Sequence, residues 1–335
     1  MNDRVQKQLD ELNKRFYAVY QVKYFEHALH LTLAGLVDPK AALVPLLEEQ
    51  SIPGDSAAGI LRIRITTEDL EEDDFRKSIK LQLVHLYHHS LETLLRLFLA
   101  HGPGIRCPWV EMARESSIPK FKKRVRDVRA MGAEWTGVNP EDEGIPYVFL
   151  PAEPTAERIP YLTAAKQWLN YAATATLDVF AYNSFRHGLA VSAGEAQLGW
   201  YPKGSDPRER DDAQPLIEAR GDAIGILRRE RQPDGSYHWM EETRWINVPE
   251  LVMITWVAQK YIQAILTVGA ARFAEGSLDS LWLPSYTPYE ALKHGQKDGI
   301  RIDRFTIQLA FVEVPEQTVS DAAEPGQGNR AEPRP

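Results

Sequence analysis

Apolar residues recur every three or four positions over several long stretches of the chain, which is the period of a helix with one buried face. The first such stretch covers residues 3–36 and the second covers residues 75–101, where Gly102-Pro103-Gly104 gives a strong stop signal. The third covers residues 161–194. The fourth begins at Asn247, a suitable N-cap, and continues to about residue 273. The pattern therefore predicts four long helices, of which the last is apolar nearly all round and should be the most buried.

A period of two, which is typical of strands, occurs in shorter segments. Residues 59–66 predict a short strand, and residues 222–231 and 236–247 flank Gln-Pro-Asp-Gly and predict a hairpin. Residues 304–314 alternate cleanly and predict a further strand beside that hairpin, whereas residues 195–220 are polar and predict a mobile loop. The expected fold is mainly α, a four-long-helix bundle with a small antiparallel β-sheet formed by the hairpin inserted before the last helix and a C-terminal strand.

The amino-acid composition is consistent with that fold and bears on the cellular compartment of the protein. Of 335 residues, 44% are hydrophobic and 26% are charged, which is enough apolar material for one domain over residues 1–315 with a β insertion at about 195–247. Residues 316–335 are poor in apolar side chains and predict a disordered tail. The single cysteine, Cys107, rules out an internal disulfide, and the charged N-terminus does not resemble a signal peptide. We therefore expect a cytoplasmic protein that does not enter a membrane.

The net charge of −8 argues against a protein that holds duplex nucleic acid by overall positive charge. One segment departs from this balance, because six of the ten residues 120–129 are Lys or Arg, directly after Ile118-Pro119. The segment predicts a short basic helix that begins at the proline. Two interpretations remain. The helix is either an ordinary solvated surface helix or a binding surface for a phosphate backbone, and in the second case the binding residues are Lys120, Lys122, Lys123, Arg124, Arg126 and Arg129.

The second long helix carries a polar stripe opposite its apolar face. Its members, His85, His89, Glu92 and Arg96, follow one another at intervals of three or four residues. Such a stripe is either a solvated charged face or the polar lining of a groove between helices. The same residues bear on metal binding, because His85, His89 and Glu92 with Glu26 and His30 would supply part of a di-iron site. No Glu-x-x-His occurs on the later helices, however, so we expect neither a metal nor a cofactor.

The third long helix contains the most distinctive motif, Tyr182-Asn183-Ser184-Phe185-Arg186-His187-Gly188. At 100° per residue, Asn183 and His187 fall on the same arc as the apolar side chains of this helix. Burial of an amide and an imidazole costs free energy unless each has a hydrogen-bond partner. The motif therefore indicates either a hydrogen-bonded core pair that sets the register of the bundle or a cleft.

A helical bundle whose late helix carries this motif resembles the HEPN superfamily, the higher-eukaryote and prokaryote nucleotide-binding helical domains. The resemblance covers the helices, including residues 91–101, and implies a protein of a defence or toxin type that binds RNA or nucleotides as a homodimer. In active members, an Arg and a His four to six residues apart form a metal-independent RNase site. Arg186 and His187 are adjacent, whereas Arg96 and His101 have the stated spacing.

The resemblance implies roles for three side chains if the motif is catalytic. His187 would act as acid or base, Arg186 would stabilise charge on phosphorus, and Asn183 would orient the imidazole or the phosphate. The alternative is a non-catalytic helical scaffold that captures a protein partner with the aromatic residues of the hairpin. Tyr237, Trp239 and Trp245 provide that aromatic surface.

Overall fold

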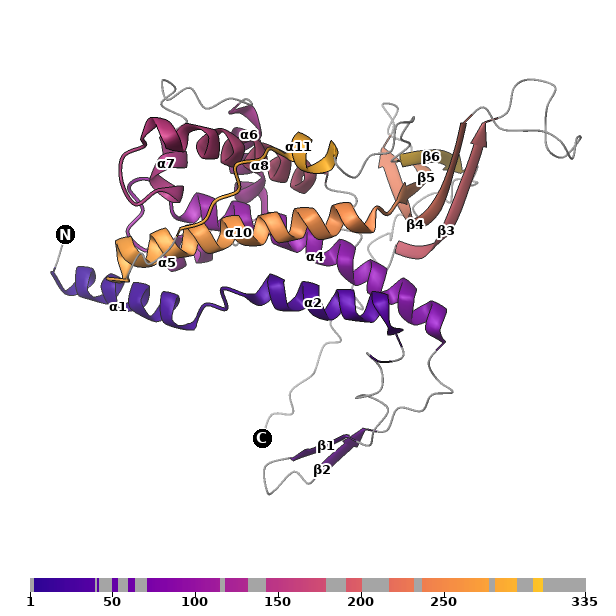
Figure 1. Cartoon of the computed structure of the whole chain (residues 1–335), viewed down its shortest axis with the longest axis horizontal. Helices are drawn as coiled ribbons and strands as arrows, with labels where there is room; N and C mark the ends of the chain where they lie inside the picture. Colours follow the sequence, from indigo (N-terminus) through magenta and orange to yellow (C-terminus); the bar gives the residue numbers. More distant parts are fainter. Residues whose placement is uncertain are drawn as a thin grey trace, which may run out of the picture.

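The computed structural model describes residues 3–39, 41, 50–53, 60–63, 71–114, 118–131, 143–178, 191–200, 217–231, 237–276, 281–293 and 304–309. Within these ranges the protein is mainly helical with small antiparallel β-sheets (Figure 1). The helices are α1 Asp3–Val19, α2 Tyr24–Val37, α4 Glu72–Ala100, α5 Pro108–Arg114, α6 Ile118–Ala130, α7 Gly144–Phe149, η3 Ala156–Arg158, α8 Ile159–Leu177, α10 Val248–Phe273 and α11 Pro288–Lys293. The strands are β1 Gln50–Pro53, β2 Ile60–Ile63, β3 Val191–Trp200, β4 Ile217–Arg231, β5 Tyr237–Trp245 and β6 Arg304–Leu309.

The helices form three layers, with α4 and α10 side by side in the middle, α1 and α2 on one side, and α6, α7 and α8 on the other (Figure 1). The main core lies between these layers, and Leu95, Trp168 and Tyr261 are at most 1% exposed there. The indole Nε1 of Trp168 donates to the carbonyl of Tyr286 at 2.9 Å, which fixes the segment that precedes α11 against α8. The apolar residues that predicted the long helices thus form one continuous core.

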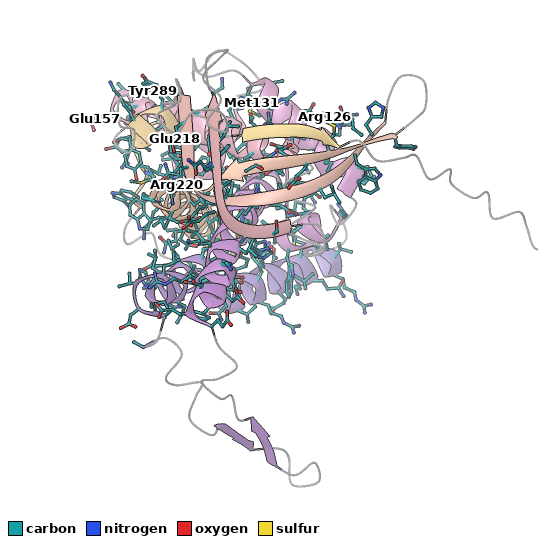
Figure 2. All side chains as sticks on the ribbon, turned by 90° about the vertical axis from the view of Figure 1, so that its right-hand side faces the viewer. Arg126, Met131, Glu157, Glu218, Arg220 and Tyr289 are labelled. Carbon is teal, nitrogen blue, oxygen red and sulfur yellow. The ribbon has the colours of Figure 1, made fainter. Side chains whose placement is uncertain are left out.

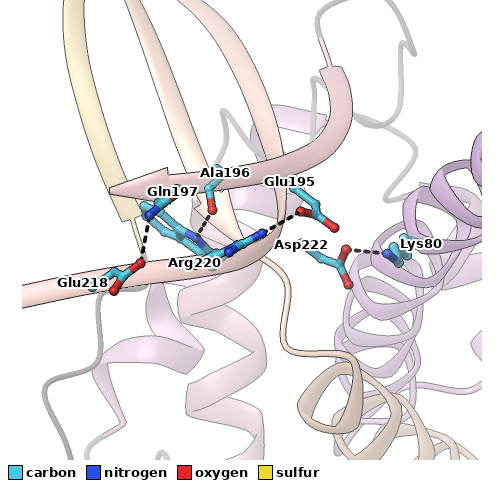
Figure 3. Close-up of polar contacts among 8 residues, drawn as sticks. Lys80, Glu195, Ala196, Gln197, Glu218, Arg220 and Asp222 are labelled. Carbon is cyan, nitrogen blue, oxygen red and sulfur yellow. Dashed lines mark hydrogen bonds and ion pairs between the residues drawn. The ribbon is translucent and has the colours of Figure 1, made fainter. Parts of the chain in front are cut away.

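The four-stranded sheet has the order β3-β4-β5-β6 and lies at one end of the helical layers (Figure 1). A separate small core of Val84, Ile224 and Ile226 joins it to the N-terminal half of α4. An ion pair between Lys80 of α4 and Asp222 of β4 adds to this contact, next to a polar ladder between β3 and β4 (Figure 3). In that ladder, Gln197 donates to Glu218 at 2.8 Å. Among the buried residues of this small core, only Val84 comes from a helix, so α4 carries most of the apolar contact between the sheet and the bundle.

Several elements agree with the sequence prediction. The second and fourth predicted helices are α4 and α10, and the side chain of Asn247 accepts from the N–H of Glu250 at the start of α10. The basic helix is α6, the hairpin strands are β4 and β5, and the C-terminal strand is β6, which pairs with β5. The short strand predicted at residues 59–66 is β2, which pairs with β1. The predicted tail at 316–335 lies outside the described residues.

The first predicted helix is wrong in one respect, because it is broken between α1 and α2 at residues 20–23. The backbone N–H of Val22 donates to the carbonyl of Tyr20 at 2.9 Å, a contact that a helix does not make. The carbonyl of Val22 accepts from the side chain of Gln259 on α10. A hydrogen bond from a residue more than two hundred positions away thus replaces a helical one, and local periodicity carries no trace of it.

The third predicted helix is also wrong in its extent. It is α8, which ends at Leu177 and not at residue 194, and residues 191–200 form β3 instead. Residues 195–220, predicted as a mobile loop, contain the end of β3 and the start of β4. Ten residues of β3 pair with β4, from Val191 with Ile226 to Trp200 with Ile217. This non-local pairing determines the conformation, because the segment has little period of its own.

One described helix, α10, is long and apolar enough to cross a membrane by length and composition alone. In its most apolar window, however, 61% of the residues are buried by the rest of the protein. Burial of this extent is typical of a core helix, and the packing of α10 against α4 accounts for its apolar character.

Candidate functional site

A cavity of about 250 Å³ lies where the helical layers meet the sheet. Its walls come from α4, the C-terminal end of α8, strands β4 and β5, and the N-terminal turn of α10. Aromatic, apolar and ionisable side chains all face it. They include Tyr87, His88, Tyr171, Asp178, Ile224, Arg244, Trp245, Asn247 and Glu250. Convergent polar groups in a concave, partly apolar site are the usual mark of ligand binding.

Arg244 of β5 is the electrostatic centre of this cavity. Its Nη2 lies 2.9 Å from a carboxylate oxygen of Asp178, and its Nε donates to the carboxylate of Glu242. Glu242 is only 1% exposed, so its charge depends on this partner. Arg304 of β6 approaches the same two carboxylates at 4.0 and 3.7 Å. The cluster therefore links α8 to β5 and β6 by charge.

Two tyrosine hydroxyls and one histidine complete the polar lining. The hydroxyls of Tyr87 and Tyr171 lie 3.1 Å apart, and burial raises the pKa of Tyr87 to about 12. Burial, with a smaller contribution from the positive charge of Arg244, lowers the pKa of His88 to about 3. At neutral pH Tyr87 and His88 are therefore uncharged and can both donate and accept hydrogen bonds.

The predicted catalytic residues Asn183, Arg186 and His187 lie outside the described residues, so their roles stay a prediction. Asp178, which lines the cavity, is the last described residue before the segment 179–190 that contains them. The other Arg and His pair with the spacing of active HEPN members does not form a joint site. His101 is buried, with Tyr17 at 2.8 Å and the carbonyl of Leu97 at 2.7 Å, and Arg96 binds Glu92 instead.

Comparison of the chain with family models, with curated proteins and with solved structures gives no match.

The polar stripe of α4 divides between two environments. His89, together with Thr93 outside the stripe, borders a groove of about 260 Å³ beside the break between α1 and α2, and the role of the stripe as a polar lining stays a prediction. The rings of His85 and His89 stack with centroids 5.8 Å apart, and burial lowers the pKa of His89. Glu92 is 8% exposed and binds Arg96 at 2.7 Å, so this end of the stripe is an internal ion pair.

The residues considered as metal ligands do not gather in the structure. Within the described parts of the chain, no three His, Cys, Asp or Glu side chains come close enough to hold a metal ion together. Glu26 lies 3.5 Å from the amino group of Lys260 on α10, and so it stabilises the contact between α2 and α10.

The basic helix α6 presents most of its charges to solvent. Lys120, Lys123, Arg126 and Arg129 are exposed, while Phe121, Val125 and Val128 on the other face are buried. Figure 2 shows Arg126, near the C-terminal end of α6, on the side of the molecule opposite α1 and α2. Arg124 differs from the exposed residues, because it binds Glu111 at 3.1 Å and the carbonyl of Leu99 at 2.9 Å. It holds α6 against α5 and α4, so part of its hydrogen-bonding capacity is already used within the protein.

The aromatic side chains of the hairpin lie in two different environments. Tyr237 and Trp239 of β5 are 36% and 38% exposed, whereas Trp245 turns inward, lines the cavity and lies with its Nε1 3.4 Å from the carbonyl of Ala196. The use of this hairpin by a protein partner stays a prediction.

Sequence reasoning missed the cavity, because His88, Asp178 and Arg244 come from three elements with no common motif. The nearest signal was the cluster of histidines on α4.

Proposed function

We propose that this chain is a HEPN-like helical protein that binds RNA, with α6 as the surface on which the phosphate backbone lies. The observation that supports this most directly is the exposed charge of α6. The helix has six basic residues and one acidic residue in a chain whose net charge is −8. Positive charge that persists on one face of an acidic protein is suited to a polyanion.

The contacts of α6 also support the proposal. Among the described residues, Lys120, Lys123, Arg126 and Arg129 are in no ion pair, while Arg124 alone is used to hold the helix in place. The exposed cations are therefore available to phosphates, and their helix is fixed by the burial of Phe121, Val125 and Val128. A rigid row of cations binds a phosphate backbone without base contacts, so this surface supplies affinity and not sequence preference.

Reversal of two charges on α6, Lys123→Glu with Arg126→Glu, is expected to weaken the binding of a single-stranded RNA by about tenfold or more at low salt. The slope of log affinity against log salt should become shallower by about 0.7 for each phosphate that the protein no longer neutralises. Filter binding at several salt concentrations measures both quantities.

A matched control places the same charge change on α1, which lies on the opposite side of the helical layers (Figure 1). Lys7 and Lys14 are exposed there, and Lys7→Glu with Lys14→Glu should leave the salt slope unchanged. Equal weakening by the two double variants would show that RNA responds only to net charge, and retention of RNA by the α6 variant would rule out α6 as the surface.

We further propose that Asn183, Arg186 and His187 cleave the bound RNA without a metal, in a homodimer. Exposed apolar residues on α2, Leu31 at 75% and Val37 at 82%, offer surface for a second copy. Labelled RNA should be cleaved in the presence of a chelator, and His187→Ala should abolish cleavage because it removes the acid or base. His27→Ala, at an exposed position of α2, is the control and should cleave normally. Persistent cleavage by His187→Ala, or RNA that stays intact with the unaltered protein, would contradict an enzymatic role.

A further inference from the structure

The cavity beside Arg244 is unsuited to phosphate, although it lies on the same protein as the basic helix. One positive side chain that lines it, Arg244, faces two negative ones, Asp178 and Glu250, so the lining has a net negative charge. Arg244 is further neutralised by Glu242. A phosphate would be repelled here, whereas an uncharged ring with hydrogen-bonding groups would not.

The walls of the cavity favour a flat ligand. Tyr87, Tyr171 and Trp245 supply aromatic side chains, and Val84 and Ile224 supply apolar contact, in a volume of about 250 Å³. Unstacked bases of single-stranded RNA bind by stacking on aromatic side chains and by hydrogen bonds along their edges. The cavity thus has the size and lining to take one base.

The hydrogen-bonding groups indicate which bases would fit. The carboxylates of Asp178 and Glu250 accept hydrogen bonds, and acidic side chains recognise the exocyclic amino group of a base such as cytosine. Uracil has no amino group, and its edge presents a single N–H donor between two carbonyl oxygens that the carboxylates would repel. The cavity should therefore discriminate between bases, which α6 does not.

The cavity is also within reach of an RNA strand that lies on α6. The side chain of Asn170 on α8 donates to the carbonyl of Arg129 at the end of α6, at 2.6 Å. Asp178 directly follows the last residue of α8, eight residues after Asn170. Eight residues correspond to about 12 Å along the helix axis. A few nucleotides of single strand span this distance.

We propose that this cavity binds one unpaired RNA base that carries an exocyclic amino group, while neighbouring phosphates lie on α6. The placement of the neighbouring phosphates on α6 rests on the proposed RNA binding. The binding of a base in the cavity does not, and a nucleoside without phosphate tests it separately.

The first test compares oligocytidine and oligouridine hexamers by fluorescence anisotropy at one salt concentration. The cytidine hexamer should bind about tenfold more tightly. Tyr171→Leu should reduce that advantage, because it weakens stacking in a cavity that cytosine enters and uracil does not. Tyr171→Phe keeps the ring and should retain the preference. Trp282→Ala, at an aromatic residue that is 52% exposed and contacts Trp256 outside the cavity, should change nothing. Thermal unfolding of each variant verifies that it is folded.

The second test uses cytidine and uridine at millimolar concentration and follows backbone amide resonances by NMR. Cytidine should shift the resonances of residues around Asp178 and Arg244, and uridine should not. Equal binding of the two hexamers, unchanged by Tyr171→Leu, together with no shift by cytidine, would overturn the base site and leave RNA binding by α6 intact. Cytidine shifts at the cavity in a protein that retains no RNA would support the base site and overturn the proposed function.

Discussion

Replacement of Arg244 by Met should lower the free energy of unfolding by about 3 kcal/mol, because it removes the guanidinium that lies directly against a buried carboxylate. The side chain of Glu242 is 2% exposed and is bound by the Nε of Arg244, while Asp178 lies on the other side of the guanidinium. Arg304 also approaches the two carboxylates, but it is more distant and more exposed than Arg244, so it compensates less for their charge. Urea unfolding at neutral pH measures the decrease.

A second substitution distinguishes an unpaired charge from a packing defect. Glu242→Gln in the Arg244→Met background removes the buried negative charge that Arg244 balanced and should recover most of the stability, although Glu242→Gln alone should not stabilise the protein. Arg220→Met is the matched control on the neighbouring strand. Arg220 lies 4.0 Å from Glu195 with both side chains exposed, so its removal should change stability very little. Failure of the double variant to recover would indicate that Arg244 acts through packing.

Acidification from pH 7 to 4.5 should destabilise the protein by about 5 kcal/mol through two buried histidines. Burial, with smaller contributions from nearby charges, lowers the pKa of His88 to about 3 and the pKa of His101 to about 4. Each unfolded histidine takes up a proton as the pH falls through about 6.5, and the folded form cannot. The unfolded state thus binds more protons, and stability falls throughout the interval between 6.5 and the lowered value.

The groups that face these histidines differ, which permits a control. His101 lies between Tyr17 of α1 and the carbonyl of Leu97, with Arg272 of α10 lowering its pKa further. His101→Gln should reduce the slope of unfolding free energy against pH by about one proton between pH 5 and 6. His30→Gln, at an exposed position of α2, should leave the slope unchanged. A slope that His101→Gln does not alter would show that His101 does not contribute to the acid response.

The sequence predicted those elements whose signal is local. Helices α4, α6 and α10 carry their own periodicity and stop or start signals, and the β4 and β5 strands flank a strong turn. The break at Val22 and the strand β3 depend on partners far away in the chain, namely Gln259 and β4, which no local pattern encodes. The cavity could not be predicted for the same reason, because Arg244 and Asp178 meet only when β5 packs against the end of α8.

The two apolar cores differ greatly in extent, and this has a consequence for how the protein opens. The sheet is anchored by Val84, Ile224 and Ile226, whereas the helical layers share a core that extends over most of the long helices. Local opening in proteins begins where the least apolar surface is buried, so the sheet should detach as a unit while the helices stay folded. Because the cavity lies between these two parts, that partial opening would widen it at only the free-energy cost of detaching the sheet.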